Sequence, residues 1–354
     1  MLKEKLTASS LASLRKCPRQ YLYAYEFKLR RSTEAAPLRM GSAFHAGMEA
    51  RNLGVPEAEA IPKATEGYGI VPSWATPEEW AVEAEIVRCL LAGYFWYYRN
   101  DVRQVVATET VFEIPLVNPQ TGAASRTFSL AGKIDGIEVE SGALAVAEYK
   151  TTSEDIGPDS EYWLWLRCDP QICQYVLAAR ALGFDLSRVL YDRTRKPTIR
   201  PKQVVNLDPE GLRVVLNATG ERVYLKNGKP RQTGSTKDGH VLQTHTETAT
   251  EYGERLLADI GARPEYYYQR REVPILDDQL AEFRLELWQQ ARQLAEARKH
   301  RRWFRNVGPM TCRYCSYSRL CLNNATVDPN GPPPAGYEFL PDAHPELQTA
   351  GETQ

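Results

Sequence analysis

The strongest constraint on the fold is a change in hydrophobic period near the middle of the chain. Residues 105–117, 126–140 and 143–150 alternate apolar with polar positions or run continuously apolar, which is typical of β-strands. The segments between them, 118–122 (Asn-Pro-Gln-Thr-Gly) and 140–142 (Glu-Ser-Gly), carry residues that tight turns favour. The pattern therefore predicts a three-stranded antiparallel meander.

Helical periodicity flanks the meander on both sides. We predict helices over 7–25, 39–53, 77–99, 161–183, 208–226, 247–261 and 277–302, and further strands over 188–194 and 199–207. Residues 54–75 are interpreted as a connector, 227–246 as a loop that orders only with a ligand, and 325–354 as a disordered tail. No internal repeat is apparent.

The predicted elements indicate an α/β fold with a mixed sheet core flanked by helices. We divide the chain into an N-terminal helical region (1–100), a sheet core (101–207), a helical C-terminal region (208–324) and the tail (325–354). The 44 Lys and Arg residues nearly balance the 45 Asp and Glu residues, so net charge identifies no partner. No apolar run approaches the ~20 residues that cross a bilayer, and the N-terminus lacks a secretory apolar core, so we expect a cytoplasmic protein that does not bind membranes.

The second and third predicted strands carry the residues best suited to catalysis or metal binding, Asp135, Glu148 and Lys150. Glu148 and Lys150 are two positions apart, so their side chains leave the same face of a strand. Such a pair is usually the solvent face of a strand, but residues 144–147 are almost all apolar and suggest burial on both faces. Buried carboxylates are costly unless they bind a metal or each other. Oxygen ligands of this kind suit Mg²⁺ or Mn²⁺, and Lys150 would orient an attacking water.

At these residues the sequence resembles the PD-(D/E)XK nuclease superfamily, which implies a restriction-endonuclease-like fold. It is similar to the RecB-like branch that includes phage-encoded and CRISPR-associated exonucleases. Residues 41–45 (Gly-Ser-Ala-Phe-His) resemble an upstream motif of that branch, and residues 171–175 (Gln-Ile-Cys-Gln-Tyr) a later helical motif. The resemblance implies a metal site of His45, Asp135, Glu148 and the backbone carbonyl of Tyr149, with Lys150, Gln171 and Tyr175 completing the catalytic site. The branch often has an acidic residue in the first strand, for which Glu109 and Glu113 both remain candidates.

Seven cysteines in a chain without an export signal favour a metal site or buried thiols over disulfides. Cys312, Cys315 and Cys321 have metal-ligand spacing, and Cys17 is the candidate fourth ligand; zinc and [4Fe–4S] both accept four cysteines. The resemblance to RecB-like nucleases of the iron–sulfur type implies a [4Fe–4S] cluster that joins the helical N- and C-terminal parts. We interpret the remaining three, Cys89, Cys168 and Cys173, as buried apolar thiols.

The expected activity is a Mg²⁺- or Mn²⁺-dependent deoxyribonuclease, an exonuclease on single-stranded DNA or duplex ends rather than an endonuclease. Aromatic and basic residues interleave at 266–271 and 301–305, which suits single-stranded DNA, although an aromatic core with a charged rim gives the same pattern. The alternatives are a catalytically idle DNA-binding subunit with the same fold, and zinc in place of iron–sulfur. No helicase motif is present, so unwinding would need a helicase or recombination partner; polarity, pathway and oligomeric state stay open.

Overall fold

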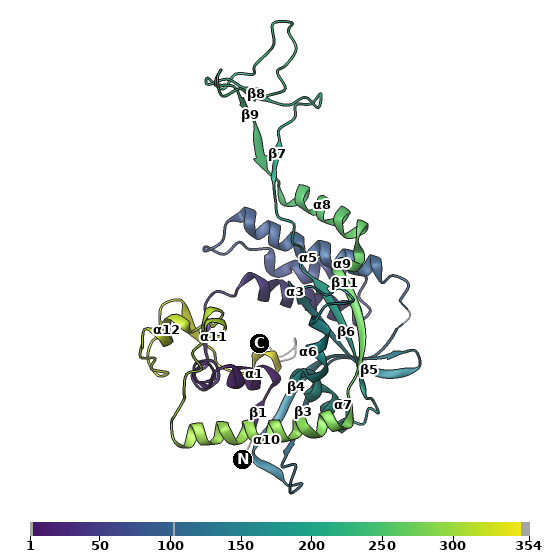
Figure 1. Ribbon diagram of the computed structural model, residues 1–354, viewed down its shortest axis with the longest axis vertical. Helices are drawn as coiled ribbons and strands as arrows, with labels where there is room; N and C mark the ends of the chain where they lie inside the picture. The colour runs from purple at the N-terminus through teal and green to yellow at the C-terminus, as the bar shows by residue number, and fades with distance from the viewer. Residues whose placement is uncertain (1–2, 102, 348–354) are drawn as a thin grey trace.

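The computed structural model describes residues 3–101 and 103–347, and its centre is a mixed six-stranded sheet (Figure 1). The strand order is β1-β4-β5-β6-β11, with β3 pairing antiparallel to β4. The strands are β1 (Glu4–Leu6), β3 (Gln104–Val117), β4 (Ala124–Glu140), β5 (Ala143–Thr152), β6 (Arg188–Arg195) and β11 (Tyr268–Pro274). The predicted three-stranded meander is confirmed as β3-β4-β5.

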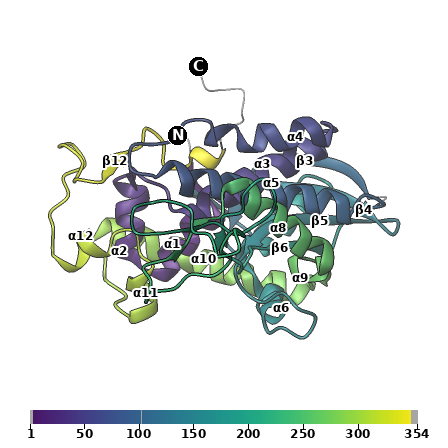
Figure 2. The same cartoon turned by 90° about the horizontal axis from the view of Figure 1, so that it is seen from above.

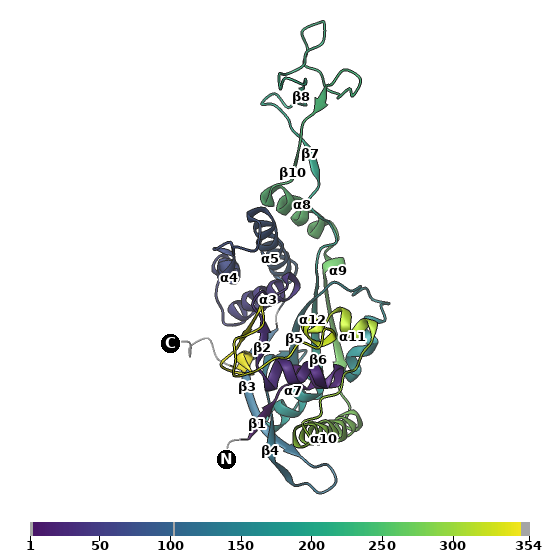
Figure 3. The same ribbon diagram turned by 90° about the vertical axis from the view of Figure 1, so that its left-hand side faces the viewer.

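Helices cover both faces of the sheet (Figures 1 and 3). One layer contains α1 (Ala8–Lys16), α7 (Pro170–Ala181) and α10 (Asp277–Lys299), whose buried residues share one core cluster with β4 and β6. The other contains α3 (Ala36–Asn52), α4 (Glu57–Thr65), α5 (Pro77–Tyr97) and α8 (Ala249–Ala262), in a second cluster that includes Ala147 and Tyr149. Strand β5 is therefore buried on both faces, as its apolar run predicts.

One edge of β4 has a gap in its backbone pairing, and the candidate site lies beside this gap. Strand β1 pairs with β4 only as far as Leu130, while β5 pairs with it from Gly136 onward. Between the two, the amide of Gln174 on α7 donates to the carbonyl oxygens of Leu6 and Ala131, at 3.3 and 3.0 Å. One buried side chain thus replaces part of the missing ladder and ties α7 to the gap.

Prolines break two of the predicted helices. The helix predicted over 7–25 is interrupted at Cys17, where α1 ends and α2 (Pro18–Tyr21) begins, followed by a π-helical turn (Leu22–Glu26). The helix predicted over 161–183 is divided into α6 (Tyr162–Trp165), a 3₁₀ turn (Leu166–Cys168) and α7, because Pro170 cannot continue a helix but suits a first turn. The connector over 54–75 contains α4, so it is partly helical.

The helix predicted over 208–226 is wrong. Residues 203–246, here called the arm, form a projection built from β7 (Gln203–Val205), β8 (Val215–Leu216), β9 (Val241–Leu242) and β10 (Thr244–Thr246), which extends beyond the helices in Figures 1 and 3. Strands β7 and β10 pair as an antiparallel stalk. Glycines 211, 220, 228 and 239 have positive φ, a conformation that turns need and helices exclude.

The arm also contains an internal repeat, which contradicts the expectation that none exists. Arg213, Arg222, Arg231 and His240 recur every nine residues. The same spacing relates Leu207, Leu216 and Leu225, whose segments each lead into a tight turn. The repeat is short and its units are turns, so neither a helical nor a strand period reveals it.

Segments from the N-terminal and C-terminal regions of the chain lie side by side, on the left of Figures 1 and 2. Strand β2 (Leu29–Arg31) pairs antiparallel with β12 (Tyr337–Phe339), beside α11 (Pro309–Arg313) and α12 (Ser318–Leu322). Residues 325–347 are thus ordered against the N-terminal region, unlike the predicted disordered tail; the rest of that prediction, 348–354, falls outside the described residues. The remaining short elements are α9 (Pro264–Tyr267) and 3₁₀ turns at Glu66–Tyr68 and Pro345–Leu347. Within 3–101 and 103–347, no helix has the length and apolar content to cross a membrane.

Candidate active site and cysteine cavity

Asp135 and Glu148 lie where β4 and β5 separate. The ladder between these strands begins at Gly136 and Ala147, and Asp135 and Glu148 are the next residues along each strand. A side-chain bond replaces the next backbone bond, because the Tyr149 N–H donates to Oδ2 of Asp135 at 3.1 Å. The structure thus brings both predicted carboxylates to the point where β4 and β5 diverge, with Asp135 9% and Glu148 2% exposed.

Helix α7 supplies the next part of the site. The side chain of Asp169 accepts from the Gln171 N–H at 2.9 Å, which caps the helix and fixes its first turn. From there the Gln171 amide nitrogen donates to Oε1 of Glu148 at 3.2 Å, and the Gln171 amide oxygen accepts from Lys150 Nζ, also at 3.2 Å. The Tyr175 hydroxyl lies 3.0 Å from the same amide nitrogen. Four predicted residues, Glu148, Lys150, Gln171 and Tyr175, therefore form one hydrogen-bonded group.

Helix α3 approaches the carboxylates with His45. Its Nδ1 lies 3.6 Å from Oδ2 of Asp135. Burial lowers the pKa of His45, so the ring is held neutral, the form that can ligate a cation. The predicted upstream histidine is thus placed beside the strand carboxylates, although it is almost a hundred residues away in the sequence.

The structure separates the two candidates for the acidic residue in the first strand. Glu109 lies opposite Asp135, between the paired positions Thr108 with Gly136 and Thr110 with Ile134. It pairs with Lys133, and its charge contributes to raising the pKa of Asp135. Glu113 instead accepts a hydrogen bond from Ser129, away from the site. Glu109 is the acidic residue that faces the carboxylates.

The carboxylate cluster is electrostatically unfavourable as it stands. Burial, followed by repulsion from Glu109, raises the pKa of Asp135 to about 7. Burial, followed by repulsion from Asp135, raises the pKa of Glu148 to about 8. Oε2 of Glu148 is buried without a hydrogen-bond partner among the described residues. A bound cation would stabilise both ionised carboxylates and would give Oε2 of Glu148 a partner, so the residues present fit a divalent metal.

The described residues do not, however, already form a closed ligand set. Within 3–101 and 103–347, no group of three or more His, Cys, Asp or Glu side chains stands in a geometry that would hold an ion. His45 lies beside the carboxylates, and the four cysteines border a cavity of their own, but neither set closes around a centre among the described residues. The metal roles of His45, Asp135, Glu148 and the Tyr149 carbonyl thus remain predictions.

Arg193 is a residue of this site that sequence reasoning missed. It pairs in register with Lys150 across β5 and β6, so both side chains lie on the face that carries Glu148. The Arg193 side chain is fully buried, donates to the Glu148 carbonyl oxygen at 2.9 Å, and keeps Nε and Nη2 without partners among the described residues. Its charge opposes the rise in the pKa of Glu148. An arginine inside a buried strand, next to a carboxylate strand, is the signal that could have revealed it.

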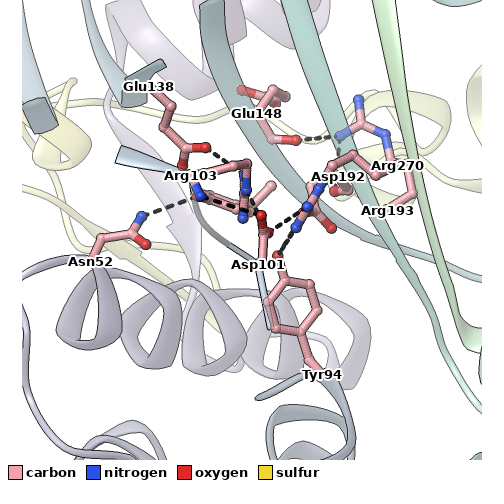
Figure 4. Close-up of polar contacts among 10 residues, drawn as sticks. Asn52, Tyr94, Asp101, Arg103, Glu138, Glu148, Asp192, Arg193 and Arg270 are labelled. Atoms are coloured by element: carbon pink, nitrogen blue, oxygen red, sulfur yellow. Dashed lines mark hydrogen bonds and ion pairs between the residues drawn. The ribbon is translucent and has the colours of Figure 1, made fainter. Parts of the chain in front are cut away.

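A buried ionic network lies behind the site, shown in Figure 4. The Tyr149 hydroxyl donates to Glu138, which also pairs with Arg103. From Arg103 the network continues through Asp101, Arg270 and Asp192 to the hydroxyl of Tyr94 on α5. Tyr149 therefore connects the carboxylates with the ionic network, since its backbone N–H donates to Asp135 while its side chain donates to Glu138.

This network decides between the two interpretations of residues 266–271. Tyr267 and Tyr268 are core residues and Arg270 is buried in ion pairs, so 266–271 is an aromatic core with charged partners rather than a surface for single-stranded DNA. Residues 301–305 differ, because Phe304 is 59% exposed between exposed arginines.

The four predicted cluster cysteines line one small cavity between the ends of the chain. Cys17, Cys312, Cys315 and Cys321 all border it. The N–H of Asn306 donates to Sγ of Cys17 at 3.4 Å, the kind of contact that stabilises a thiolate ligand. Neighbouring contacts hold the two ends together directly: Arg19 bonds the Trp303 carbonyl, and Arg298 pairs with Glu4 and Glu26.

The other cysteines lie elsewhere. Cys89 and Cys173 are buried, as predicted, and burial raises the thiol pKa of each to about 12. Cys168 is exposed, which corrects the expectation that it is buried; it lies in the 3₁₀ turn before α7.

Comparisons with known proteins identify the family of the chain. No curated protein matches the sequence, and nine solved chains match the structure. One of them, described as "Crystal structure of SSO0001", covers 92% of this chain and 90% of its own at 14% identity and a TM-score of 0.33, too distant to assign residues. A family model described as the PD-(D/E)XK nuclease superfamily matches residues 5–322, nearly the whole chain. The chain therefore belongs to the PD-(D/E)XK nuclease superfamily.

Proposed function

We propose that the protein is a metal-dependent deoxyribonuclease that acts as an exonuclease on single-stranded DNA or duplex ends. The observation that carries the proposal is the group formed by Asp135, Glu148, Lys150 and Gln171 at the point where β4 and β5 separate. Two buried carboxylates beside a lysine are the donor set that phosphodiester hydrolysis needs. Membership of the nuclease superfamily supports the same reading.

The residues of the group have separable roles. Asp135 and Glu148, with His45 and the Tyr149 carbonyl, would hold Mg²⁺ or Mn²⁺, which when bound lowers the pKa of water and offsets charge on the phosphate. Lys150 extends its amine from the same strand face to hold the attacking water and to offset negative charge on the phosphate oxygens. Gln171 fixes both Glu148 and Lys150, and Tyr175 fixes Gln171.

We propose further that Cys17, Cys312, Cys315 and Cys321 hold a [4Fe–4S] cluster. Their placement around one cavity and the N–H contact to Cys17 support four-thiolate ligation. The cluster lies away from the carboxylates and has a structural role, tying α1 and α2 to the segment after α10. A protein purified without oxygen should be brown with broad visible absorbance, whereas a colourless zinc protein would contradict iron–sulfur.

The activity is tested with end-labelled DNA, single- and double-stranded, linear and circular, in Mg²⁺ or Mn²⁺. We expect linear DNA to be degraded to short products from its ends and circular DNA to persist, because an exonuclease needs an end. Cleavage of closed circles would indicate an endonuclease. A dependence on added helicase for duplex DNA would indicate that a partner supplies unwinding.

Lys150→Ala separates a nuclease from an idle DNA-binding subunit. We expect cleavage to fall by at least about a hundredfold, since one charge-stabilising donor is lost, while DNA binding in EDTA is retained. Lys5→Ala is the control, because Lys5 on β1 pairs with Glu113, which lies away from the carboxylates. Cleavage that survives Lys150→Ala would refute the assignment of Lys150.

A further inference from the structure

The arm begins at the catalytic edge of the sheet. Strands β5 and β6 are parallel, and β6 ends at Arg195 beside Thr152, just past Lys150. The chain then runs from 196 to 202 into the stalk of the arm. Residues 193–202 contain five basic residues and no acidic one, Arg193, Arg195, Lys196, Arg200 and Lys202. A basic segment therefore leads from the site to the arm.

The base of the arm is fixed to the body. At the foot of the stalk Glu247 pairs with Arg255 of α8 at 2.6 Å and accepts from the Lys202 N–H at 3.1 Å. On the stalk itself His245 bonds the Asn206 side chain at 2.6 Å. These contacts hold the projection in one direction, away from the body, as Figures 1 and 3 show.

The turns of the arm are individually closed. Asp208 accepts from the Glu210 and Leu212 N–H groups, Asn217 from those of Thr219 and Glu221, each before a glycine of positive φ. Backbone bonds then stack the turns, with Val223 donating to Val215 and Arg231 to Val223, both at 2.9 Å. The tip is a built structure rather than a loop that waits for a ligand.

Charge is concentrated at the tip. Residues 223–237 contain Lys226, Lys229, Arg231 and Lys237 and no Asp or Glu, a charge of +4. Since the whole chain has a net charge of −1, the other residues together have −5. The side chains of Lys226, Lys229 and Lys237 are exposed and make no hydrogen bond or ion pair within the described part of the chain.

We propose that the arm is a DNA-holding element that binds the phosphate backbone of the substrate beyond the nucleotides at the active site. The inference rests on the proposed nuclease function, because DNA is the polyanion that this site would cleave. Lysines on a turn scaffold contact phosphates without reading bases, so the binding is independent of sequence.

The charge pattern favours DNA over a protein partner. Protein interfaces are depleted of lysine at their centres, whereas backbone-binding surfaces are enriched in it. Exposed apolar residues also occur on the arm, Leu207 and Val241 outside the acid-free segment and Tyr224 and Leu225 inside it. Within 223–237 the exposed lysines nevertheless outnumber the exposed large apolar residues by three to two. The basic segment 193–202 could bind the phosphates of the same DNA strand between the site and the tip.

The test compares two triple variants of the full chain. The arm variant is Lys226→Gln, Lys229→Gln and Lys237→Gln. The control is Arg284→Gln, Arg292→Gln and Lys299→Gln, three exposed residues of α10, which lies at the end of the molecule opposite the arm in Figure 1. Binding of long single- and double-stranded DNA, about 40 nucleotides, is measured by fluorescence anisotropy in EDTA at several salt concentrations.

We expect the arm variant to lose long-DNA affinity and about 2 to 3 units of the slope of log K against log salt, since each phosphate contact contributes roughly 0.7 to 0.9. Between 50 and 200 mM salt the wild type should thus weaken about twentyfold to fortyfold more than the arm variant. The control should keep the wild-type slope. Cleavage of a short oligonucleotide of about 10 nucleotides should be unchanged in both variants, because it does not reach the tip.

The outcomes separate the two proposals. A wild-type protein that neither binds nor cleaves DNA would refute the proposed function itself. If the wild type binds and cleaves DNA but the arm variant keeps its affinity and salt slope, the DNA-holding role is refuted while the nuclease stands. An equal loss in the α10 control would also refute it, because the effect would then come from net charge.

Discussion

At the scale of single residues, the acidic residue opposite Asp135 offers the cleanest comparison. Glu109→Gln removes one negative charge from the cluster and leaves Lys133 unpaired, so we expect Mn²⁺ affinity to fall about tenfold or more, equivalent to at least about 1.4 kcal/mol. Glu113→Gln, on the same strand but bonded to Ser129, should bind Mn²⁺ within about twofold of the wild type. Titration calorimetry measures both; equal affinities in the two variants would contradict a role for Glu109.

The raised pKa values of Asp135 and Glu148 predict how stability depends on pH without metal. In the unfolded chain both carboxyls ionise near pH 4. In the folded protein their pKa values are about 7 and 8, because both are buried and because Glu109 repels Asp135 and Asp135 repels Glu148. The folded state therefore binds more protons between these values, and stability falls as pH rises through the window, by at most about 1.4 kcal/mol per pH unit for each group.

Thermal unfolding in EDTA checks this expectation. The melting temperature of the wild type should fall between about pH 5 and pH 8 relative to that of the double variant Asp135→Asn, Glu148→Gln, which lacks both ionisations. Added Mg²⁺ should recover stability most at the alkaline end, where both carboxyls are ionised. Parallel pH curves for the two proteins would show that these carboxyls do not titrate as the structure indicates.

At the scale of elements, the ionic network ties β4, β6, β11 and the residues just before β3, Asp101 and Arg103, to α5. Arg103→Met would leave Glu138 and Asp101 buried without their shared partner, so we expect a loss of about 3 to 5 kcal/mol in the free energy of unfolding. Arg263→Met, in a partly exposed pair with Asp259 on α8, should cost less than about 1 kcal/mol. Urea titrations followed by circular dichroism give both values, and similar losses would contradict the importance of burial.

Some helices and strands of the structure can be predicted from the local sequence pattern, and others cannot. The meander, β6, α5, α8 and α10 follow from hydrophobic period and capping residues, whereas the residues of the candidate site were predicted from resemblance to motifs of a known family. The arm was predicted wrongly because residues 208–226 have a composition compatible with a helix, while their turns are decided by Gly211 and Gly220 at positive φ. The roles of Arg193 and Gln174 depend on which strands become neighbours, which is a tertiary fact.

At the scale of the whole molecule, the ends of the chain meet through contacts that no local pattern contains. The pairing of β2 with β12 and the bonds of Arg298 to Glu4 and Glu26 join them without a metal. The clustering of Cys17 with the C-terminal cysteines was predicted from spacing and resemblance, and their common cavity agrees with it. The contribution of a metal cluster to holding the ends together depends on the free energy of closing the loop between them.

Closing a loop that spans nearly the whole chain costs about 5 kcal/mol of chain entropy, which ligation by Cys17 would offset. We therefore expect Cys17→Ser to lose iron and visible absorbance and to melt at a lower temperature, while the direct contacts keep it folded. Short DNA should still be cleaved, at a reduced rate, because no carboxylate of the site is removed. Cys168→Ser, outside the cavity, should match the wild type in iron, absorbance and melting temperature. Full iron content in Cys17→Ser would contradict ligation by Cys17, and loss of iron with an unchanged melting temperature would mean that the ends are held by protein contacts alone.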